Sequence, residues 1–163
     1  MNLTKSFSLL ELTSSETAAR KGIDNTPTHN VVVNLRELCV NVLQPLRDLY
    51  NKPINITSGY RSPKLNKAIG GSSSSDHCLG NAADFTVPKD DYARVFGMIQ
   101  DMSVDQCILE MCTNGYPQWI HVSFRNKSEN RNQFLIAYKN AFGQTKYMPY
   151  TKKDFDRIYF NLK

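Results

Sequence analysis

The sequence of 163 residues lacks any apolar run that approaches the roughly 20 residues needed to cross a membrane as a helix. Its first residues, MNLTKSFSLLELTSSE, also lack the apolar core of about 7–15 residues that is typical of a secretory signal. We therefore expect synthesis in the cytoplasm without a signal peptide and no membrane partner. Any work outside the cell would need another export route.

Cysteine is also scarce, and its four positions are scattered along the chain: Cys39, Cys78, Cys107 and Cys112. This number and spacing argue against a disulfide scaffold, so we expect four free thiols in a reducing compartment. Hydrophobic residues make up 40% of the chain and charged residues 21%, as in an ordinary soluble globular protein. The length favours one domain with its own core, and we expect a monomer.

Acidic residues are rare at the end of the chain, where residues 125–163 contain nine Lys and Arg but only three Asp and Glu. A basic end favours an anionic partner, either nucleic acid or a bacterial wall. It is equally compatible with a charged surface that keeps the protein soluble. Because the segment lacks a paired aromatic platform or a recognition motif, we do not expect nucleic acid to be the partner.

The spacing of apolar residues and turn residues predicts helices alternating with strands. Helices are predicted at residues 7–21, 30–51, 62–69, 90–102 and 151–162, and Pro45 can kink the second of them. Strands are predicted at residues 54–60, 82–87, 106–112, 118–125 and 133–140. This order predicts a single α+β domain over residues 1–163, with an antiparallel sheet and flanking helices.

The stretch SSSSDHCLGNAADF (72–85) places His77 and Asp84 seven residues apart, with Gly80 between them. The glycine allows the loop to turn back, so the imidazole and the carboxylate can meet on one ion. Imidazole nitrogen together with carboxylate oxygen suits zinc. Without further evidence, the same pair also fits a polar loop.

The stretch WIHVSF (119–124) adds a third candidate ligand. Its alternation predicts a strand with Trp119 and His121 on one face and Ile120 and Val122 in the core. Two histidines and one aspartate would leave a fourth position open for water, which is the pattern of catalytic zinc. The alternative is a half-exposed histidine that is hydrogen-bonded to its neighbours.

Three blocks of the sequence, SGYRSPKLN (58–66), GGSSSSDHCLGNAADF (70–85) and WIHVSF, together resemble the zinc D-Ala-D-Ala carboxypeptidase family. That family also contains L-alanyl-D-glutamate endopeptidases of bacteriophage lysins and shares its fold with the Hedgehog signalling domain. The resemblance covers about residues 5–140 and leaves 141–163 as a basic extension. It implies a Hedgehog-like α+β fold and one zinc ion, with these ligands: His77, Asp84 and His121.

The resemblance also implies that Arg61 and Ser75 contact a carboxylate or a carbonyl of the substrate. The guanidinium of Arg61 is an always-charged fork suited to a carboxylate, although the residue could instead serve a local turn. Trp119 can line the cleft or pack against neighbouring side chains.

The chain departs from the family pattern at Gln118, where many members carry an acidic general base three positions before the second histidine. An amide cannot accept a proton from water, so the base must come from elsewhere or be missing. A hairpin that is symmetric about NGYP (114–117) would place Glu110 directly opposite His121. We predict Glu110 as the general base; it could alternatively fix the tautomer of His121 or be merely solvated.

These features predict a zinc metallopeptidase that hydrolyses an amide bond in the stem peptides of bacterial peptidoglycan. It would be a D-Ala-D-Ala carboxypeptidase or an L-Ala-D-Glu endopeptidase, and a phage endolysin or a virion-associated wall hydrolase. Its place of action would be the cell wall, after release from the cell or as part of a virion. The alternative is a zinc-bearing but inactive binding or structural module, which Gln118 would permit.

Overall fold

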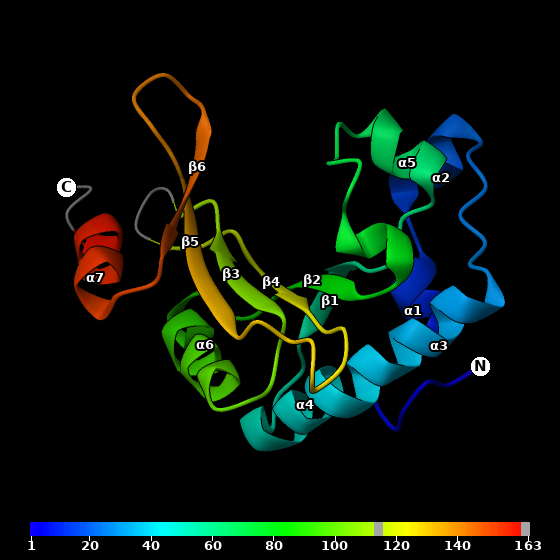
Figure 1. Cartoon of the computed structure of the whole chain (residues 1–163), viewed down its shortest axis with the longest axis horizontal. Helices are drawn as coiled ribbons and strands as arrows, with labels where there is room; N and C mark the ends of the chain where they lie inside the picture. The colour runs from blue at the N-terminus through cyan, green and yellow to red at the C-terminus, as the bar shows by residue number, and fades with distance from the viewer. Residues whose placement is uncertain (113–115, 161–163) are drawn as a thin grey trace.

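The computed structural model describes residues 1–112 and 116–160. Its predicted helices and strands follow one another in the predicted order (Figure 1). The helices are α1 Leu9–Thr13, α2 Glu16–Lys21, α3 His29–Leu38, α4 Gln44–Tyr50, α5 Pro63–Ala68, α6 Tyr92–Gln100 and α7 Lys152–Phe160. A π-helical segment spans Cys39–Leu43, and short 3₁₀ helices span Asp76–Leu79 and Lys89–Asp91. The strands are β1 Asn55–Ser58, β2 Ala82–Thr86, β3 Gln106–Glu110, β4 Trp119–Ser123, β5 Gln133–Lys139 and β6 Thr145–Pro149.

The six strands form one sheet in the order β1-β2-β4-β3-β5-β6. All neighbouring pairs are antiparallel, as predicted, except β3 and β5, which run parallel. Strand β6 was not among the predicted strands, and Pro149 at its end is a weak strand former. It pairs antiparallel with β5 and so extends the sheet beyond the predicted strands. The α+β class is confirmed.

The predicted helix at 30–51 is one continuous helical stretch, in which the π-helical segment Cys39–Leu43 directly precedes α4. Pro45 explains the π segment, because a proline ring inside a helix has no N–H to donate and collides with the carbonyl four residues earlier. The wider turn accommodates the ring, and the Gln44 N–H donates to the Cys39 carbonyl five residues back. The helix therefore continues past Pro45.

The predicted helix at 7–21 is divided in two by a pair of serines. Ser14 has an extended backbone and ends α1, while the side chain of Ser15 accepts a hydrogen bond from Ala18 N at 3.2 Å and caps α2. Serine oxygens compete for backbone N–H groups in this way, which favours helix ends over helix interiors.

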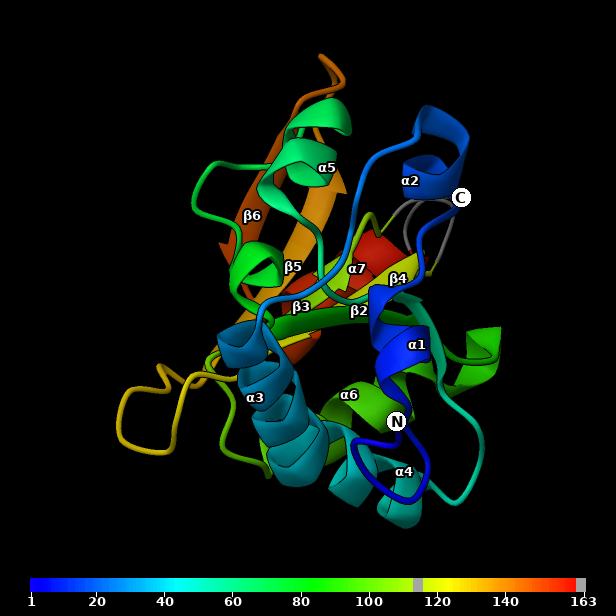
Figure 2. The same cartoon turned by 90° about the vertical axis from the view of Figure 1, so that its right-hand side faces the viewer.

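The hydrophobic core lies between one face of the sheet and helices α3, α4 and α6, which Figure 2 shows on the same side of the sheet. It includes the fully buried side chains of Leu35, Leu46, Phe85, Ile99 and Ile120. Helix α5 and the segment leading into β2 lie on the opposite side (Figure 2). That opposite face of the sheet is therefore left for polar side chains. Within the described residues, no helix is long and apolar enough to cross a membrane.

Candidate metal centre

His77 is held on a short 3₁₀ turn that enters β2, and its side chain is 2% exposed. Gly80 ends the turn with φ 75°, a left-handed conformation suited to glycine, and a Cβ there would lie 2.7 Å from the Val31 carbonyl oxygen. His77 Nδ1 lies 2.7 Å from the carbonyl oxygen of Gly59. A carbonyl only accepts, so Nδ1 carries the proton and Nε2 keeps its lone pair for a ligand or a metal.

Asp84 on β2 and His121 on β4 are direct partners across the antiparallel pair. Their side chains therefore share the sheet face opposite the core. Asp84 Oδ1 lies 2.8 Å from His121 Nδ1 and 3.3 Å from His77 Nε2, and the two histidine nitrogens are 3.3 Å apart. The three predicted ligands thus converge at one point, although they come from a loop and two strands.

The donor set fits zinc in chemistry and spacing. Two imidazole nitrogens and one carboxylate oxygen are common zinc ligands, and three protein ligands leave one coordination position open. Tetrahedral zinc with bonds of about 2.0–2.1 Å holds its ligand atoms about 3.3 Å apart. The observed separations of 2.8–3.3 Å match that spacing. The residues present can therefore hold one zinc ion.

The charges at these ligands also favour a cation. Burial raises the pKa of Asp84, but His77 and His121 outweigh it, so the pKa lies well below its ordinary value and Asp84 is a carboxylate. Burial lowers the pKa of His121, but the hydrogen bond and charge of Asp84 reverse this and raise it. A negative charge is therefore fixed at the centre, where it attracts either a proton or a metal ion.

Glu110 lies on the same sheet face, but the predicted register is wrong by two residues. Glu110 is paired with Trp119, and Ile108 is the residue opposite His121. The predicted turn at 114–117 lies partly outside the described residues. A shift of two preserves the alternation, so Glu110 still lines the cleft that contains the three ligands.

The environment of Glu110 suits a proton acceptor. Its side chain is 8% exposed, and burial raises its pKa to about 7, with His121 lowering and Asp84 further raising it. A carboxylic acid with a pKa near neutrality can both accept and return a proton at physiological pH.

The alternation of β3 breaks immediately after Glu110. Met111 has φ 51° and lines the cleft, whereas Cys112 is 2% exposed and belongs to the core. The left-handed backbone at Met111 reverses which of the two side chains faces the cleft. All four cysteines are free thiols, as predicted.

The structure brings all seven predicted site residues to one cleft of about 620 Å³ on this sheet face: Arg61, Ser75, His77, Asp84, Glu110, Trp119 and His121. Gln118 is exposed and is not among the described residues that line this cleft. Gln118 lies in a bend just before β4, and its backbone N–H donates to the Glu110 carbonyl at 2.9 Å. Of these two positions, Glu110 is therefore the one whose side chain lines the cleft.

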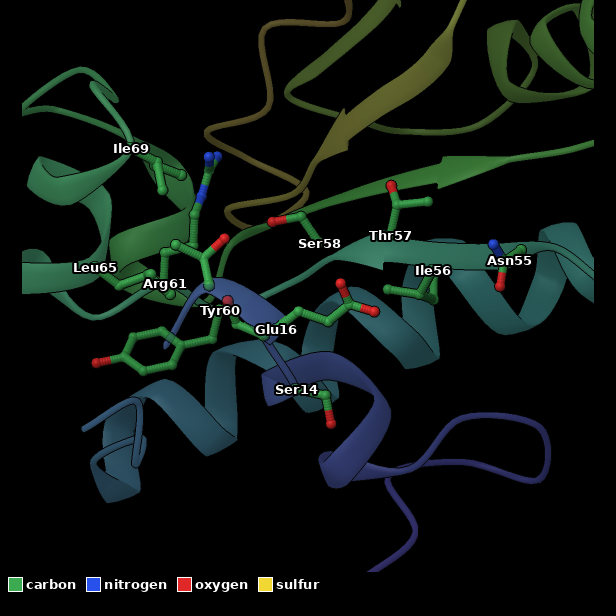
Figure 3. Close-up of a pocket in the computed structure, with 12 residues that line it drawn as sticks. Ser14, Glu16, Asn55, Ile56, Thr57, Ser58, Tyr60, Arg61, Leu65 and Ile69 are labelled. Atoms are coloured by element: carbon green, nitrogen blue, oxygen red, sulfur yellow. The ribbon is translucent and has the colours of Figure 1, made fainter. Parts of the chain in front are cut away.

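Arg61 stands at the boundary between this cleft and an adjoining pocket of about 550 Å³, and Ile69 lines both (Figure 3). Its backbone N–H donates to the His77 carbonyl, at 3.2 Å, which ties it to the ligand loop. Its Nε is buried and has no hydrogen-bond partner among the described residues, and in Figure 3 its guanidinium extends away from the Glu16 carboxylate. A buried donor without a partner is costly, so Arg61 is suited to bind an incoming acceptor.

Sequence reasoning missed the far side of the cleft. Leu135 on β5 and Tyr147 on β6 line it beyond Ile108 and Glu110 of β3. The parallel pairing of β3 with β5, and the presence of β6, place them there. Alternation within residues 133–140 could have put Leu135 on one face, but no motif indicated which strand it joins.

The comparison with protein families agrees with this geometry. A family model described as Peptidase M15 matches residues 5–123, which include the three ligands, Arg61 and Glu110. No curated protein matches the chain.

Proposed function

The chain belongs to the peptidase M15 family, a family of zinc-dependent peptidases, and we propose that it hydrolyses an amide bond in the stem peptides of bacterial peptidoglycan. The observation that carries the proposal is the position of Glu110. Its buried carboxyl, with a pKa of about 7, faces the same cleft as a three-ligand zinc site. A metal site with an open position beside a proton acceptor is the arrangement that amide hydrolysis requires.

His77, Asp84 and His121 would hold the zinc ion. When bound, zinc supplies Lewis acidity, which polarises the scissile carbonyl and makes the attacking water more acidic. Glu110 accepts a proton from that water as the oxygen attacks the carbonyl carbon. It then returns the proton to the nitrogen of the leaving amine, so the carboxyl group ends as it began.

Substrate binding would depend on three residues that line the cleft: Arg61, Ser75 and Trp119. The guanidinium of Arg61, whose Nε has no partner among the described residues, suits a carboxylate on the leaving side of the scissile bond, and the hydroxyl of Ser75 can bond a peptide carbonyl. Both D-Ala-D-Ala and L-Ala-D-Glu bonds place a carboxylate on that side. The activity would be of the carboxypeptidase or the endopeptidase type, in a phage endolysin or a virion-associated wall hydrolase.

The alternative is a zinc-bearing module without activity, which Gln118 permits. The structure weakens the reason for it, because Gln118 is exposed and is not among the described residues that line the cleft. A carboxylate is present in the cleft at Glu110 instead.

Digestion of purified peptidoglycan, with mass analysis of the fragments, tests the proposal. We expect fragments that differ by cleavage at one stem-peptide bond, loss of cleavage with a chelator, and recovery when zinc is added back. Fragments cut only in the glycan strands, or no cleavage by zinc-loaded protein, would contradict it.

A further inference from the structure

The hairpin of β5 and β6 forms the far side of the metal cleft. Tyr147 on β6 pairs with Ala137 on β5, and both Tyr147 and Leu135 lie on the sheet face of the metal ligands. The neighbours of Tyr147 along the strand point the other way: Lys146 is exposed, and Met148 packs against the core. Its cross-strand partner Ala137 has only a methyl side chain, and Tyr147 is exposed.

Tyr147 remains 55% exposed, although it lies close to the charged centre. Burial raises the pKa of its phenol, and the carboxylates of Glu110 and Asp84 raise it further. Tyr147 lines the same cleft as Glu110 and Asp84, which places its phenol within electrostatic reach of both carboxylates. An exposed aromatic ring so close to the reacting groups is placed to contact a substrate.

The cleft has the Arg61 guanidinium on one side of the candidate ligands and the side chains of Leu135 and Tyr147 on the other. In strand order, β2 and β4 carry Asp84 and His121, followed outward by β3, β5 and β6. Strands β5 and β6 contribute Leu135 and Tyr147 to the cleft, while β3 contributes Ile108 together with the polar Gln106 and Glu110. Arg61 follows β1, and Ser75 lies in the loop after α5, so both lie toward the other edge of the sheet. A bound peptide therefore meets a cation on one side and an apolar wall on the other.

We propose that Leu135 and Tyr147 form the wall that selects the substrate residue whose carbonyl is attacked, by receiving an alanine methyl group. The inference rests on the proposed function. In both candidate bonds, L-Ala-D-Glu and D-Ala-D-Ala, alanine supplies the carbonyl and the leaving residue carries a carboxylate. With the carboxylate at Arg61, the alanine extends toward Tyr147.

The hairpin that carries the wall follows residue 123, where the family match ends. The ligands and Glu110 lie within the match. The residues proposed to choose the substrate thus lie in a different part of the chain from the residues proposed to carry out hydrolysis.

Binding of stem peptides tests the wall without requiring hydrolysis. The protein has one tryptophan, and Trp119 lines the cleft, so its fluorescence reports occupancy. The probes are the pentapeptide L-Ala-D-Glu-L-Lys-D-Ala-D-Ala and its two analogues with glycine in place of the alanine at position 1 or at position 4. Zinc-loaded protein carrying Glu110→Gln binds them without cutting them, if Glu110 is the base.

We expect one glycine analogue to bind about fourfold more weakly than the pentapeptide, which is the value of one buried methyl group. Tyr147→Ala should abolish that difference and weaken binding of the pentapeptide, whereas Tyr147→Phe should preserve both. Leu135→Ala, from the neighbouring strand, should reduce the difference. Lys146→Ala is the matched control, because it alters the same strand on the opposite face and should change nothing.

Zinc content and melting temperature should be equal in Tyr147→Ala and Lys146→Ala, since Tyr147 is largely exposed. Unchanged discrimination in Tyr147→Ala, or no binding of any probe, would overturn the inference. If wild-type protein cleaves no stem peptide but Tyr147→Ala still removes the discrimination, the wall stands and the proposed hydrolysis fails. If cleavage proceeds and discrimination does not depend on Tyr147, the wall alone fails.

Discussion

The segments before and after residue 123 contribute to the same cleft in different ways. The segment within the family match supplies the three ligands and Glu110, all of them largely buried. The segment after it supplies Leu135 and the half-exposed Tyr147, together with most of the excess positive charge. The difference indicates that chemistry and substrate contact are built separately, so mutations should disturb one without the other.

The later segment is nevertheless anchored to the earlier one by buried charge. Asp105, which is fully buried just before β3, lies 2.8 Å from Arg131 Nε and 3.4 Å from Arg125 Nε. Arg125 also lies 3.7 Å from Asp76, next to the ligand His77. Arg125 and Arg131 are thus paired with acidic side chains of the protein itself. Fewer positive charges of the basic end are therefore left to bind an anionic partner.

The largest effect should come from the metal ligands. His77→Ala or Asp84→Ala removes one of three donors, and we expect loss of the bound zinc and of all activity together. Because the ligands join a loop to two strands, the melting temperature should also fall. Elemental analysis of purified protein should find about one zinc per chain in the wild type, and the absence of any divalent metal there would contradict the site.

Arg131→Ala should produce the largest loss of stability outside the centre. It removes the main partner of the buried Asp105 carboxylate; because the Arg131 side chain is 46% exposed and Arg125 stays in contact, we expect a cost of about 1–3 kcal/mol in the free energy of unfolding. Burial raises the pKa of Asp105, but Arg131 and Arg125 outweigh it and hold the pKa below its ordinary value. This stability is therefore present above about pH 4 and is lost at lower pH.

Denaturant unfolding at pH 7 measures the change, with Lys127→Ala as a control in the same loop. Lys127 is exposed, so its replacement should change the free energy of unfolding by less than about 0.5 kcal/mol. Equal losses in the two variants would show that Arg131 does not anchor the later segment.

Glu110→Gln should stabilise the metal-free protein at neutral pH. Since burial raises the pKa of Glu110 to about 7, the folded state binds its proton more tightly than the unfolded chain does. Its contribution to stability is full below about pH 4.5 and declines as pH rises through 7, by about 3 kcal/mol in total. The difference in unfolding free energy between the variant and the wild type, measured with a chelator from pH 4 to 8, should grow with pH. A flat difference would contradict the buried position of Glu110.

The smallest effect concerns the basic end. Neutralising Lys152, Lys153 and Arg157 should weaken binding to purified sacculi by a few-fold, and added salt should do the same in the wild type. Hydrolysis of a short soluble stem peptide should hardly change. Equal losses on sacculi and on the soluble peptide would mean that the segment supports the fold rather than the contact with the wall.

The convergence of the three candidate metal ligands could be predicted from sequence because each lies in a short local pattern. Asp84 and His121 share a face through strand alternation, and Gly80 gives the turn that brings in His77. The face of Glu110 could be predicted by the same alternation, but not its partner, because the geometry of the turn sets the register of a hairpin.

The far wall could not be predicted, because it depends on contacts between distant segments. Strand β5 pairs parallel with β3 rather than antiparallel with a neighbour in sequence, and β6 exists through its pairing with β5 despite Pro149. The carbonyl of Gly59, which orients His77, is likewise a backbone group that no side-chain pattern reveals.

The central claim is that Glu110 is the base of a zinc peptidase, and one paired measurement tests it most directly. Zinc content and turnover of a soluble stem peptide are measured for the wild type and Glu110→Gln, with Gln118→Glu as a control that adds a carboxylate away from the cleft. We predict about one zinc in each, a turnover reduced by roughly 10²–10⁴ in Glu110→Gln, and little change in Gln118→Glu. Equal turnover in the wild type and Glu110→Gln, or activity that appears only with Gln118→Glu, would contradict the account.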